Sequence, residues 1–144
     1  MQRTVARVLE EKESGAVFGT SPYASVYEAL EMMADKNVGA LIVLDEGRLV
    51  GIMSERDYAR KIILLNRGSR ETRVADIMTD TVLTVGPDHT MVDCMEMMTD
   101  RRIRHLPVVA DGAVIGVVSI GDVVRAVIEE QQFMIQQLES YITS

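Results

Sequence analysis

An internal repeat of one motif constrains the fold of this chain more than any other feature of its sequence. The motif Gly-hydrophobic-x-Ser-x-x-Asp occurs as GIMSERD at residues 51–57 and again as GVVSIGD at residues 116–122, an offset of 65 residues. Residues 21–58 and 86–123 align without a gap. A long period that occurs only twice argues against a solenoid. The repeat therefore predicts an α/β (α+β) fold of two β-α-β-β-α units around a pseudo-twofold axis, with their sheets packed together.

Each unit shows the same order of predicted elements. A short strand (residues 16–20 or 82–85) ends before a proline, and a helix follows that is capped by Ser25 or Thr90. An apolar hairpin comes next, and a second helix begins near residue 55 or 120. A short helix at residues 5–9 is echoed at residues 74–78. We predict one compact module with a first repeat and N-terminal helix at 1–66, a connector at 67–73, a second repeat at 74–128 and a C-terminal helical extension at 129–144.

The stretches VGALIVLDEGRLVGIMSERD and IRHLPVVADGAVIGVVSIGD resemble a tandem pair of CBS domains, known as a Bateman module, of the stand-alone bacterial type. The resemblance covers residues 5–128. It implies a regulatory sensor that binds an adenine nucleotide (AMP, ADP, ATP or NAD) in clefts between the two repeats. We expect no attached catalytic domain, so the signal would pass in trans to a protein target that the sequence does not name.

The Ser and Asp of each motif copy lie at a predicted strand-to-helix junction, where free backbone N–H groups favour an anion. Such a pair can simply cap the helix. An ionised carboxylate can also accept hydrogen bonds from both hydroxyls of a ribose. The resemblance favours the second interpretation: Asp57 and Asp122 would hold ribose, while Ser54 and Ser119 would contact ribose or phosphate.

The two predicted sites are not equivalent. Arg56 lies inside the first motif and is a phosphate candidate, whereas the matching position is Gly121, which lacks the charge but allows close backbone approach. We therefore expect ligand at both sites with different affinities. Basic residues crowd both regions, although each could be a solvated surface charge; they are Arg60, Lys61, Arg67, Arg70, Arg73, Arg101, Arg102, Arg104 and His105.

An adenine needs an apolar slot with backbone hydrogen bonds at its rim. By resemblance, the walls of this slot come from the short strand before the proline and from the start of the hairpin. The candidates are Phe18, Thr20, Val38, Gly39 and Ala40 in one unit and Leu83, Val85, Ile103, Arg104 and His105 in the other. Ordinary packing is the alternative for each residue, and the sequence leaves open which slot pairs with which Asp.

Composition excludes several other classes of protein. The net charge of −7 and pI near 4.8 disfavour nucleic-acid binding, and the apolar runs are too short to span a membrane. The single cysteine, Cys94, indicates a reducing, cytoplasmic setting, and the scattered His and Cys residues form no metal-ligand pattern. We find no P-loop or paired nucleophile and base, so we expect no enzyme, no catalytic residue and no catalytic cofactor. A nucleotide-processing enzyme is the weakest alternative.

An apolar stripe runs from the end of the second repeat into the C-terminal extension, and something must cover it. The first helix or another subunit could do so, and the resemblance implies a homodimer through helices. A structural interaction dimer without ligand is the alternative function. The residues of the stripe are Val123, Val124, Val127, Ile128, Ile135, Leu138 and Ile142.

Overall fold

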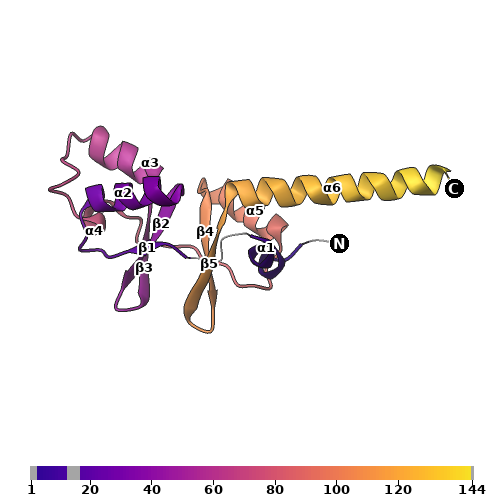
Figure 1. Ribbon diagram of the computed structural model, residues 1–144, viewed down its shortest axis with the longest axis horizontal. Coiled ribbons are helices and arrows are strands. Elements are labelled where there is room, and N and C mark those ends of the chain that lie inside the picture. The colour runs from indigo at the N-terminus through magenta and orange to yellow at the C-terminus, as the bar shows by residue number, and fades with distance from the viewer. Residues whose placement is uncertain (1–2, 13–16, 144) are drawn as a thin grey trace. The chain divides into compact units, whose positions relative to one another are not determined.

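The computed structural model describes residues 3–12 and 17–143 (Figure 1). Its contacts divide the chain into two compact units. Val17–Leu83 form the contiguous unit, while Met1–Ala16 and Thr84–Ser144 together form the split unit. The domain limits that we expect from the sequence follow the repeats, whereas the structure groups the N-terminal helix with the second repeat.

The contiguous unit contains a three-stranded sheet in the order β1-β2-β3. β1 (Gly19–Thr20) is parallel to β2 (Ala40–Asp45), which pairs antiparallel with β3 (Arg48–Ser54). The predicted strand at residues 16–20 is therefore shorter than expected, and Ala16 lies outside the described residues. The helices of this unit are α2 (Val26–Lys36), α3 (Glu55–Tyr58), the π-helix η1 (Ala59–Ile63) and α4 (Val74–Ile77).

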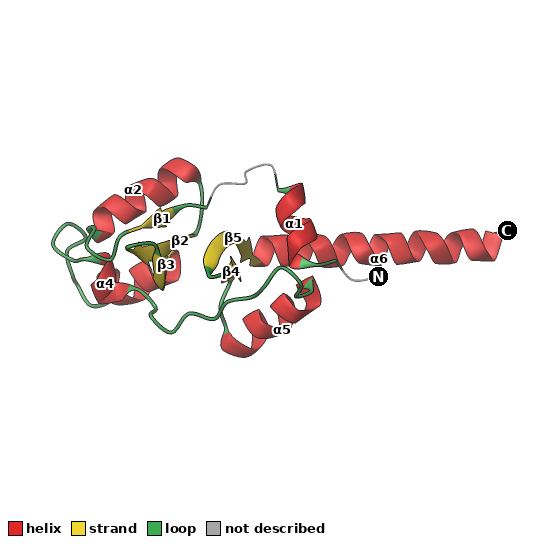
Figure 2. Ribbon diagram, turned by 90° about the horizontal axis from the view of Figure 1, so that it is seen from below, coloured by secondary structure: helices red, strands yellow, loops and turns green. Residues whose placement is uncertain are grey.

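The split unit contains the two-stranded antiparallel hairpin of β4 (His105–Ala110) and β5 (Ala113–Ser119). Its helices are α1 (Val5–Glu11), α5 (Met91–Arg101) and α6 (Ile120–Thr143). Figure 2 shows how far α6 continues beyond the hairpin of its own unit. Among the described residues, no helix is both long and apolar enough to cross a membrane.

The predicted strand at residues 82–85 is reduced to one parallel bridge between Val85 and Val108. In the contiguous unit, the amide of Ile42 donates to the carbonyl of Phe18 at 3.3 Å and extends the β1 ladder. The residue that matches Ile42 in the second repeat is Pro107, which has no N–H to donate. This missing donor explains why the second repeat keeps a bridge where the first has a strand.

Both predicted hairpins are confirmed, and their turns have the same backbone conformation. Glu46 and Gly47 have φ angles of 50° and 81°, and Asp111 and Gly112 have φ angles of 51° and 79°. Positive φ at both central positions is the type I′ pattern, whose twist matches that of the strands it joins. The shared turn fixes the same strand register in the two repeats.

Side-chain caps fix where the two long helices of the repeats begin. The Ser25 hydroxyl accepts from the amide of Glu28 at 3.1 Å, and Thr90 and Asp93 form a reciprocal capping box on α5. The hydrogen bonds from Thr90 hold the pKa of the Asp93 carboxyl below its usual value. The predicted caps are therefore confirmed.

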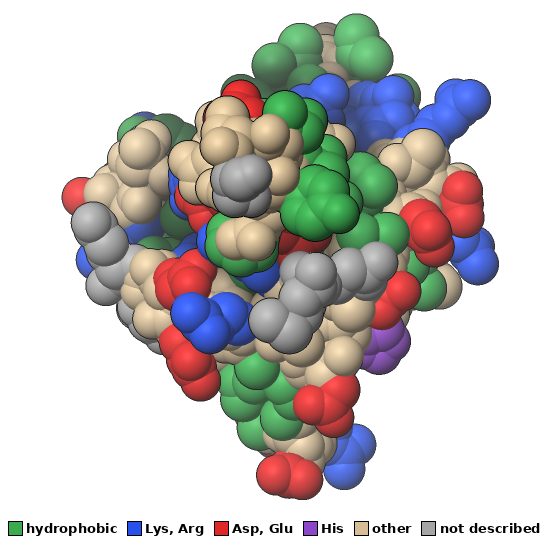
Figure 3. All heavy atoms as spheres, turned by 90° about the vertical axis from the view of Figure 1, so that its right-hand side faces the viewer, with side chains coloured by type: hydrophobic (Ala, Val, Ile, Leu, Met, Phe, Trp, Pro, Cys, Tyr) green, Lys and Arg blue, Asp and Glu red, His purple; other side chains and the backbone are tan. Residues whose placement is uncertain are grey.

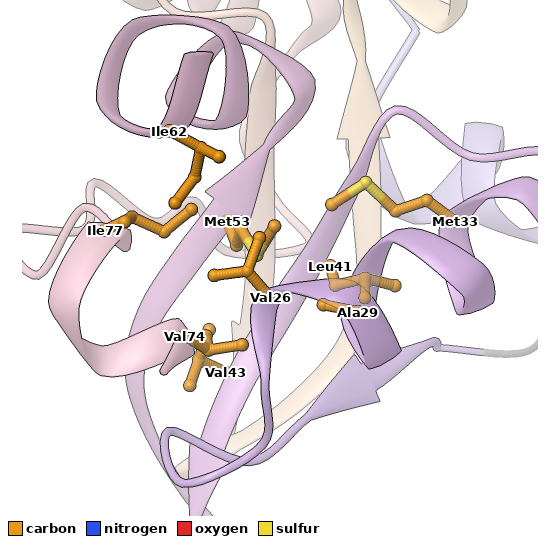
Figure 4. Packing of buried hydrophobic residues seen from close by; sticks show 9 residues of the cluster. All are labelled: Val26, Ala29, Met33, Leu41, Val43, Met53, Ile62, Val74 and Ile77. Atoms are coloured by element: carbon orange, nitrogen blue, oxygen red, sulfur yellow. The ribbon is translucent and has the colours of Figure 1, made fainter. Parts of the chain in front are cut away.

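The core of the contiguous unit lies between the β2–β3 hairpin and its helices (Figure 4). Leu41, Val43 and Met53 project from the strands, and the remaining members come from the helices around them. Met33 and its repeat counterpart Met98 are both buried, so these two methionines fill the cores of their repeats. The helical members of the cluster are Val26, Ala29, Met33, Ile62, Val74 and Ile77.

The helices α1 and α4 occupy matching positions in the two units. The helix α1 leads into the first repeat but packs on the second, and α4 leads into the second repeat but packs on the first. Val5 and Ala6 of α1 donate to the carbonyls of His89 and Pro87 at 2.8 and 3.0 Å. Val74 and Ala75 of α4 both donate at 2.9 Å, to the carbonyls of Ala24 and Pro22, which are the repeat counterparts of His89 and Pro87. The predicted echo of residues 5–9 in residues 74–78 is thus confirmed.

Glycine allows each of these helices to approach a strand of the hairpin, α4 at β3 and α1 at β5. A Cβ at Gly51 would lie 2.5 Å from the sulfur of Met78, and a Cβ at Gly116 would lie 2.7 Å from Leu9 Cδ2. Such contacts are far closer than van der Waals packing allows. The glycine that opens each motif copy therefore leaves room for the residues at the C-terminal ends of α4 and α1.

Cys94 is fully buried on α5, and burial raises the pKa of its thiol to about 11. Because the thiolate is the reactive species, we expect native protein at pH 8 to resist alkylation by iodoacetamide. Protein unfolded in guanidinium should react fully at one site per chain, as mass spectrometry would show. Rapid labelling of the native protein would contradict the buried position.

Candidate functional site at the strand-to-helix junctions

The first junction, where β3 passes into α3, is a closed capping box. The amide of Ser54 donates to Asp57 Oδ2 at 3.0 Å, and the amide of Asp57 donates to Ser54 Oγ at 3.2 Å. The Ser54 hydroxyl lies 3.1 Å from the same carboxylate oxygen. The helix-cap interpretation of this motif is therefore realised in the structure.

The second junction, where β5 passes into α6, repeats this geometry. The amide of Ser119 donates to Asp122 Oδ2 at 2.8 Å, and the amide of Asp122 donates to Ser119 Oγ at 3.2 Å. At both junctions the capping bonds end on Oδ2 of the Asp. A carboxylate has a second oxygen with its own lone pairs, so the cap leaves capacity for a ligand hydroxyl.

Thr79 and Lys61 contact the carboxylate of the first junction. The Thr79 hydroxyl donates to Asp57 Oδ1 at 3.2 Å, and Lys61 Nζ lies 3.6 Å from the same oxygen. Thr79 also exchanges backbone hydrogen bonds of 2.9 and 3.0 Å with Ile52 on β3. Sequence reasoning missed Thr79, because it lies outside the part of the chain that aligns between the repeats.

Lys12 contacts the carboxylate of the second junction. Its ammonium lies 2.9 Å from Asp122 Oδ2 and 2.9 Å from the carbonyl oxygen of Val117. The Asp122 side chain is 7% exposed and that of Lys12 is 31% exposed, so the ion pair is largely shielded from water. Sequence reasoning missed Lys12 as well, because nothing in its local pattern points to a partner so distant along the chain.

The hairpin starts predicted to line the adenine slot lie beside these junctions. The amide of Glu55 donates to the carbonyl of Gly39 at 3.1 Å, and Ala40 is the strand partner of Ser54. In the split unit, the amide of Ile120 donates to the carbonyl of Arg104 at 2.8 Å. His105 is likewise the strand partner of Ser119. Within each repeat, the structure thus brings the second half of the predicted slot to its own Ser and Asp.

Most of the other predicted slot residues pack or form hydrogen bonds within their own unit. Phe18 and Val38 are partly buried against the core cluster, and Thr20 pairs with Val43 on β2. Val85 is buried, while Ile103 donates its amide to the end of α5 at Met98 O. Leu83, the counterpart of Phe18, is the last residue of the contiguous unit. Their part in ligand binding stays a prediction.

The charged positions differ between the junctions as the sequence indicates. Arg56 is an exposed residue of α3, whereas Gly121 is an exposed residue of α6. A Cβ at Gly121 would make only an ordinary contact of 3.6 Å with Ser119 Oγ. Among the other basic candidates, Arg70 stacks over the ring of Tyr27 at 4.0 Å. Within the described residues, no group of three His, Cys, Asp or Glu side chains could hold a metal ion.

The fold and the paired junctions are those of a module built from two related repeats. The CBS domain family matches residues 16–64 and 74–129, which is most of the chain. The chain belongs to the CBS domain family and carries a tandem pair of these domains.

Individual relatives agree with this assignment. The chain is 50% identical to the mitochondrial CBS domain-containing protein CBSX3 of Arabidopsis thaliana over 123 residues, 82% of this chain and 60% of that protein. A protein with CBS domains from Burkholderia ambifaria MC40-6, whose structure has been solved, is 45% identical, with a TM-score of 0.85 over 89% of this chain and 96% of its own.

A third relative was solved with adenosine-containing ligands. The CBS domain pair of protein MJ0100, in complex with 5-methylthioadenosine and S-adenosyl-L-methionine, is 28% identical. Its TM-score is 0.76, over 87% of this chain and 95% of that chain. These relatives are named for CBS domains rather than for a catalytic activity.

Proposed function

We propose that this CBS pair is a regulatory sensor of adenine nucleotides, with AMP, ADP, ATP and NAD as the candidate ligands. The observation that carries the proposal is the matched pair of junction carboxylates, Asp57 and Asp122, each capped through Oδ2 alone by its Ser. Ribose hydroxyls are suited to donate to such a carboxylate. The adenosine-containing ligands of the MJ0100 relative support a ligand of this class.

The rest of the proposed ligand would lie along the residues beside each junction. The backbone of Gly39 and Ala40, or of Arg104 and His105, offers hydrogen bonds for a purine edge. Arg56 is the proposed phosphate contact at the first site. The matching residue at the second site is Gly121, so that site lacks this positive charge. Ligand binding would shift the populations of conformations that the protein target distinguishes.

Replacing Asp57 or Asp122 with alanine should weaken one nucleotide site each. Loss of hydrogen bonds to a charged group costs about 1.5–3 kcal/mol, which is roughly a ten- to hundredfold change in Kd. Isothermal titration calorimetry with AMP and with NAD measures the effect. Asp93→Ala is the matched control, because it removes the same kind of capping box from α5 without touching a junction.

In this experiment the control should lose stability but keep its nucleotide affinity. The proposal is wrong if neither nucleotide binds the wild-type protein at millimolar concentration. It is also wrong if Asp93→Ala weakens binding as much as the junction variants, because a general loss of helix stability would then explain the result.

We also propose that the chain forms a homodimer through α6. The N-terminal segment meets α6 through Arg3, which contacts Glu129 and Glu130. Beyond that point Ile135, Leu138 and Ile142 are 54%, 61% and 79% exposed, so α1 does not cover the stripe. In the view toward the C-terminal end of α6, hydrophobic side chains lie along one side of the helix (Figure 3).

The spacing of this stripe suits a second copy of the same helix. Val124, Ile128, Ile135, Leu138 and Ile142 follow the alternating three- and four-residue steps of a heptad seam, with Gln131 as its polar position. One core position of the seam carries isoleucine throughout, and the other carries Val124, Gln131 and Leu138. Isoleucine at position a with leucine at position d favours two parallel strands, a rule that this seam follows at Leu138. The seam carries no charge that would repel its own copy. A structural dimer without ligand is the alternative function, and a cytoplasmic location stays a prediction.

A further inference from the structure

The chain itself supplies a donor to the second junction. Lys12 Nζ donates to Asp122 Oδ2 and to the carbonyl oxygen of Val117, both at 2.9 Å. Lys12 is the C-cap residue of α1, the helix that precedes the first repeat and packs on the second. The carboxylate that would hold a ribose at this site is therefore already bonded through Oδ2 to Lys12, so a ribose that needs both of its oxygens must displace the ammonium.

The equivalent place at the first junction is filled by a neutral residue. Ile52 is the repeat counterpart of Val117, and its carbonyl accepts from the amide of Thr79 at 2.9 Å. The hydroxyl of the same Thr79 donates to Asp57 Oδ1. Lys12 in the split unit thus contacts the strand carbonyl and the junction carboxylate, as Thr79 does in the contiguous unit, but Lys12 bonds Oδ2 of its Asp and Thr79 bonds Oδ1.

The difference in charge follows from the sequence of the repeats. Lys61, which lies 3.6 Å from Asp57, has Ala126 as its repeat counterpart, and Arg56 has Gly121. The second repeat has no cation at the positions that match Arg56 and Lys61. Lys12 therefore brings a cation to the second junction from outside that repeat. An ammonium at hydrogen-bond distance from a shielded carboxylate forms a charge-assisted bond, stronger than the bond of a hydroxyl.

We propose that Lys12 is an intramolecular competitor for the ribose-binding carboxylate of the second site. The proposal rests on the function proposed above and concerns the regulation of that same site. A ribose diol can use Asp122 fully only when the Lys12 ammonium moves off the carboxylate. Ligand at the second site would therefore act on Lys12 and, through it, on the C-terminal end of α1.

The proposal gives the ligand a defined structural readout. The amide of Lys12 donates to the carbonyl of Val8 at 3.1 Å, which closes the last turn of α1. Displacement of the Lys12 side chain removes its anchor on the hairpin, so this turn should open more often. Hydrogen exchange at the Lys12 amide should therefore quicken when nucleotide saturates the second site.

The direct test measures AMP binding by calorimetry in an Asp57→Ala background, where the second site dominates. Lys12→Met keeps the aliphatic stem and removes the competing donor, and Lys12→Gln keeps a neutral donor. We expect Lys12→Met to tighten AMP binding about tenfold, equivalent to one charge-assisted hydrogen bond of about 1.4 kcal/mol, with Lys12→Gln between. Arg7→Met is the control, because it removes an equal charge from an exposed position on the same helix.

The outcomes separate this inference from the proposed function. Unchanged or weaker binding in Lys12→Met, with Arg7→Met equal to its parent, would show that Lys12 is a ligand contact or a purely structural residue, and the competitor proposal would fail. Absence of AMP binding to the wild-type protein would instead reject the proposed function. If Lys12→Met does not fold, Lys12→Gln and the exchange of the Lys12 amide in wild-type protein decide the question.

Discussion

Replacing Leu41 with alanine is expected to lower the free energy of unfolding by about 3–5 kcal/mol, the upper range for a buried leucine. Leu41 is 1% exposed and lies among Val26, Met33 and Met53 in the core of the contiguous unit. Truncation of this side chain costs the free energy of transferring it out of water. It also leaves a cavity that these neighbours cannot fill. Such a loss is a large share of the stability of an ordinary small domain.

Chemical denaturation followed by circular dichroism measures this loss. Leu64→Ala is the matched control, because Leu64 is 75% exposed and its truncation should change stability by no more than about 0.5 kcal/mol. Leu106→Ala, at the counterpart position in the split unit, should cost as much as Leu41→Ala because Leu106 is also buried. A loss below about 1 kcal/mol for Leu41→Ala would contradict the packing described for this core.

The double variant Ile135→Asp/Leu138→Asp is expected to convert the proposed homodimer into a monomer. Two carboxylates in an apolar seam have no partner there, and burying an unpaired charge costs several kcal/mol. Sedimentation equilibrium measures the association constant directly. Nucleotide affinity should be unchanged, because the seam residues lie outside both junctions.

The matched control for this experiment is Gln136→Asp/Gln137→Asp. It adds the same charge to exposed positions of the same turn of α6, away from the heptad seam. The control should stay dimeric. A monomeric wild-type protein would reject the homodimer, and a dimeric Ile135→Asp/Leu138→Asp variant would move the interface away from this seam.

Local sequence patterns predicted the elements of each repeat well. Ser25 and Thr90 cap the helices that they were expected to cap, and Asp-Gly and Glu-Gly form the turns of both hairpins. Helix caps and tight turns depend on residues that are neighbours in the sequence, so the local sequence pattern is enough to predict them. The strand predicted at residues 82–85 is only a bridge in the structure. Its hydrogen bonds would need an N–H donor at position 107, which is far along the chain and is a proline.

Contacts between distant segments could not be predicted in the same way. The similarity of residues 5–9 to residues 74–78 indicated two matching helices. It did not indicate that the helix leading into one repeat packs on the other repeat. For the same reason Thr79 and Lys12 were missed, although they contact the two carboxylates that the motif identified. The motif predicts the acceptors, whereas the donors come from segments outside the aligned repeats.

The division of the chain into a contiguous and a split unit also sets an order of events during synthesis. Residues 17–83 can fold as soon as they leave the ribosome, because every part of their unit is present. The helix α1 is made before this unit, yet the β4–β5 hairpin on which it packs is made after it. A slowly translated chain would therefore expose Val5 and Val8, which are buried in the finished protein, until the last part of the chain has been made.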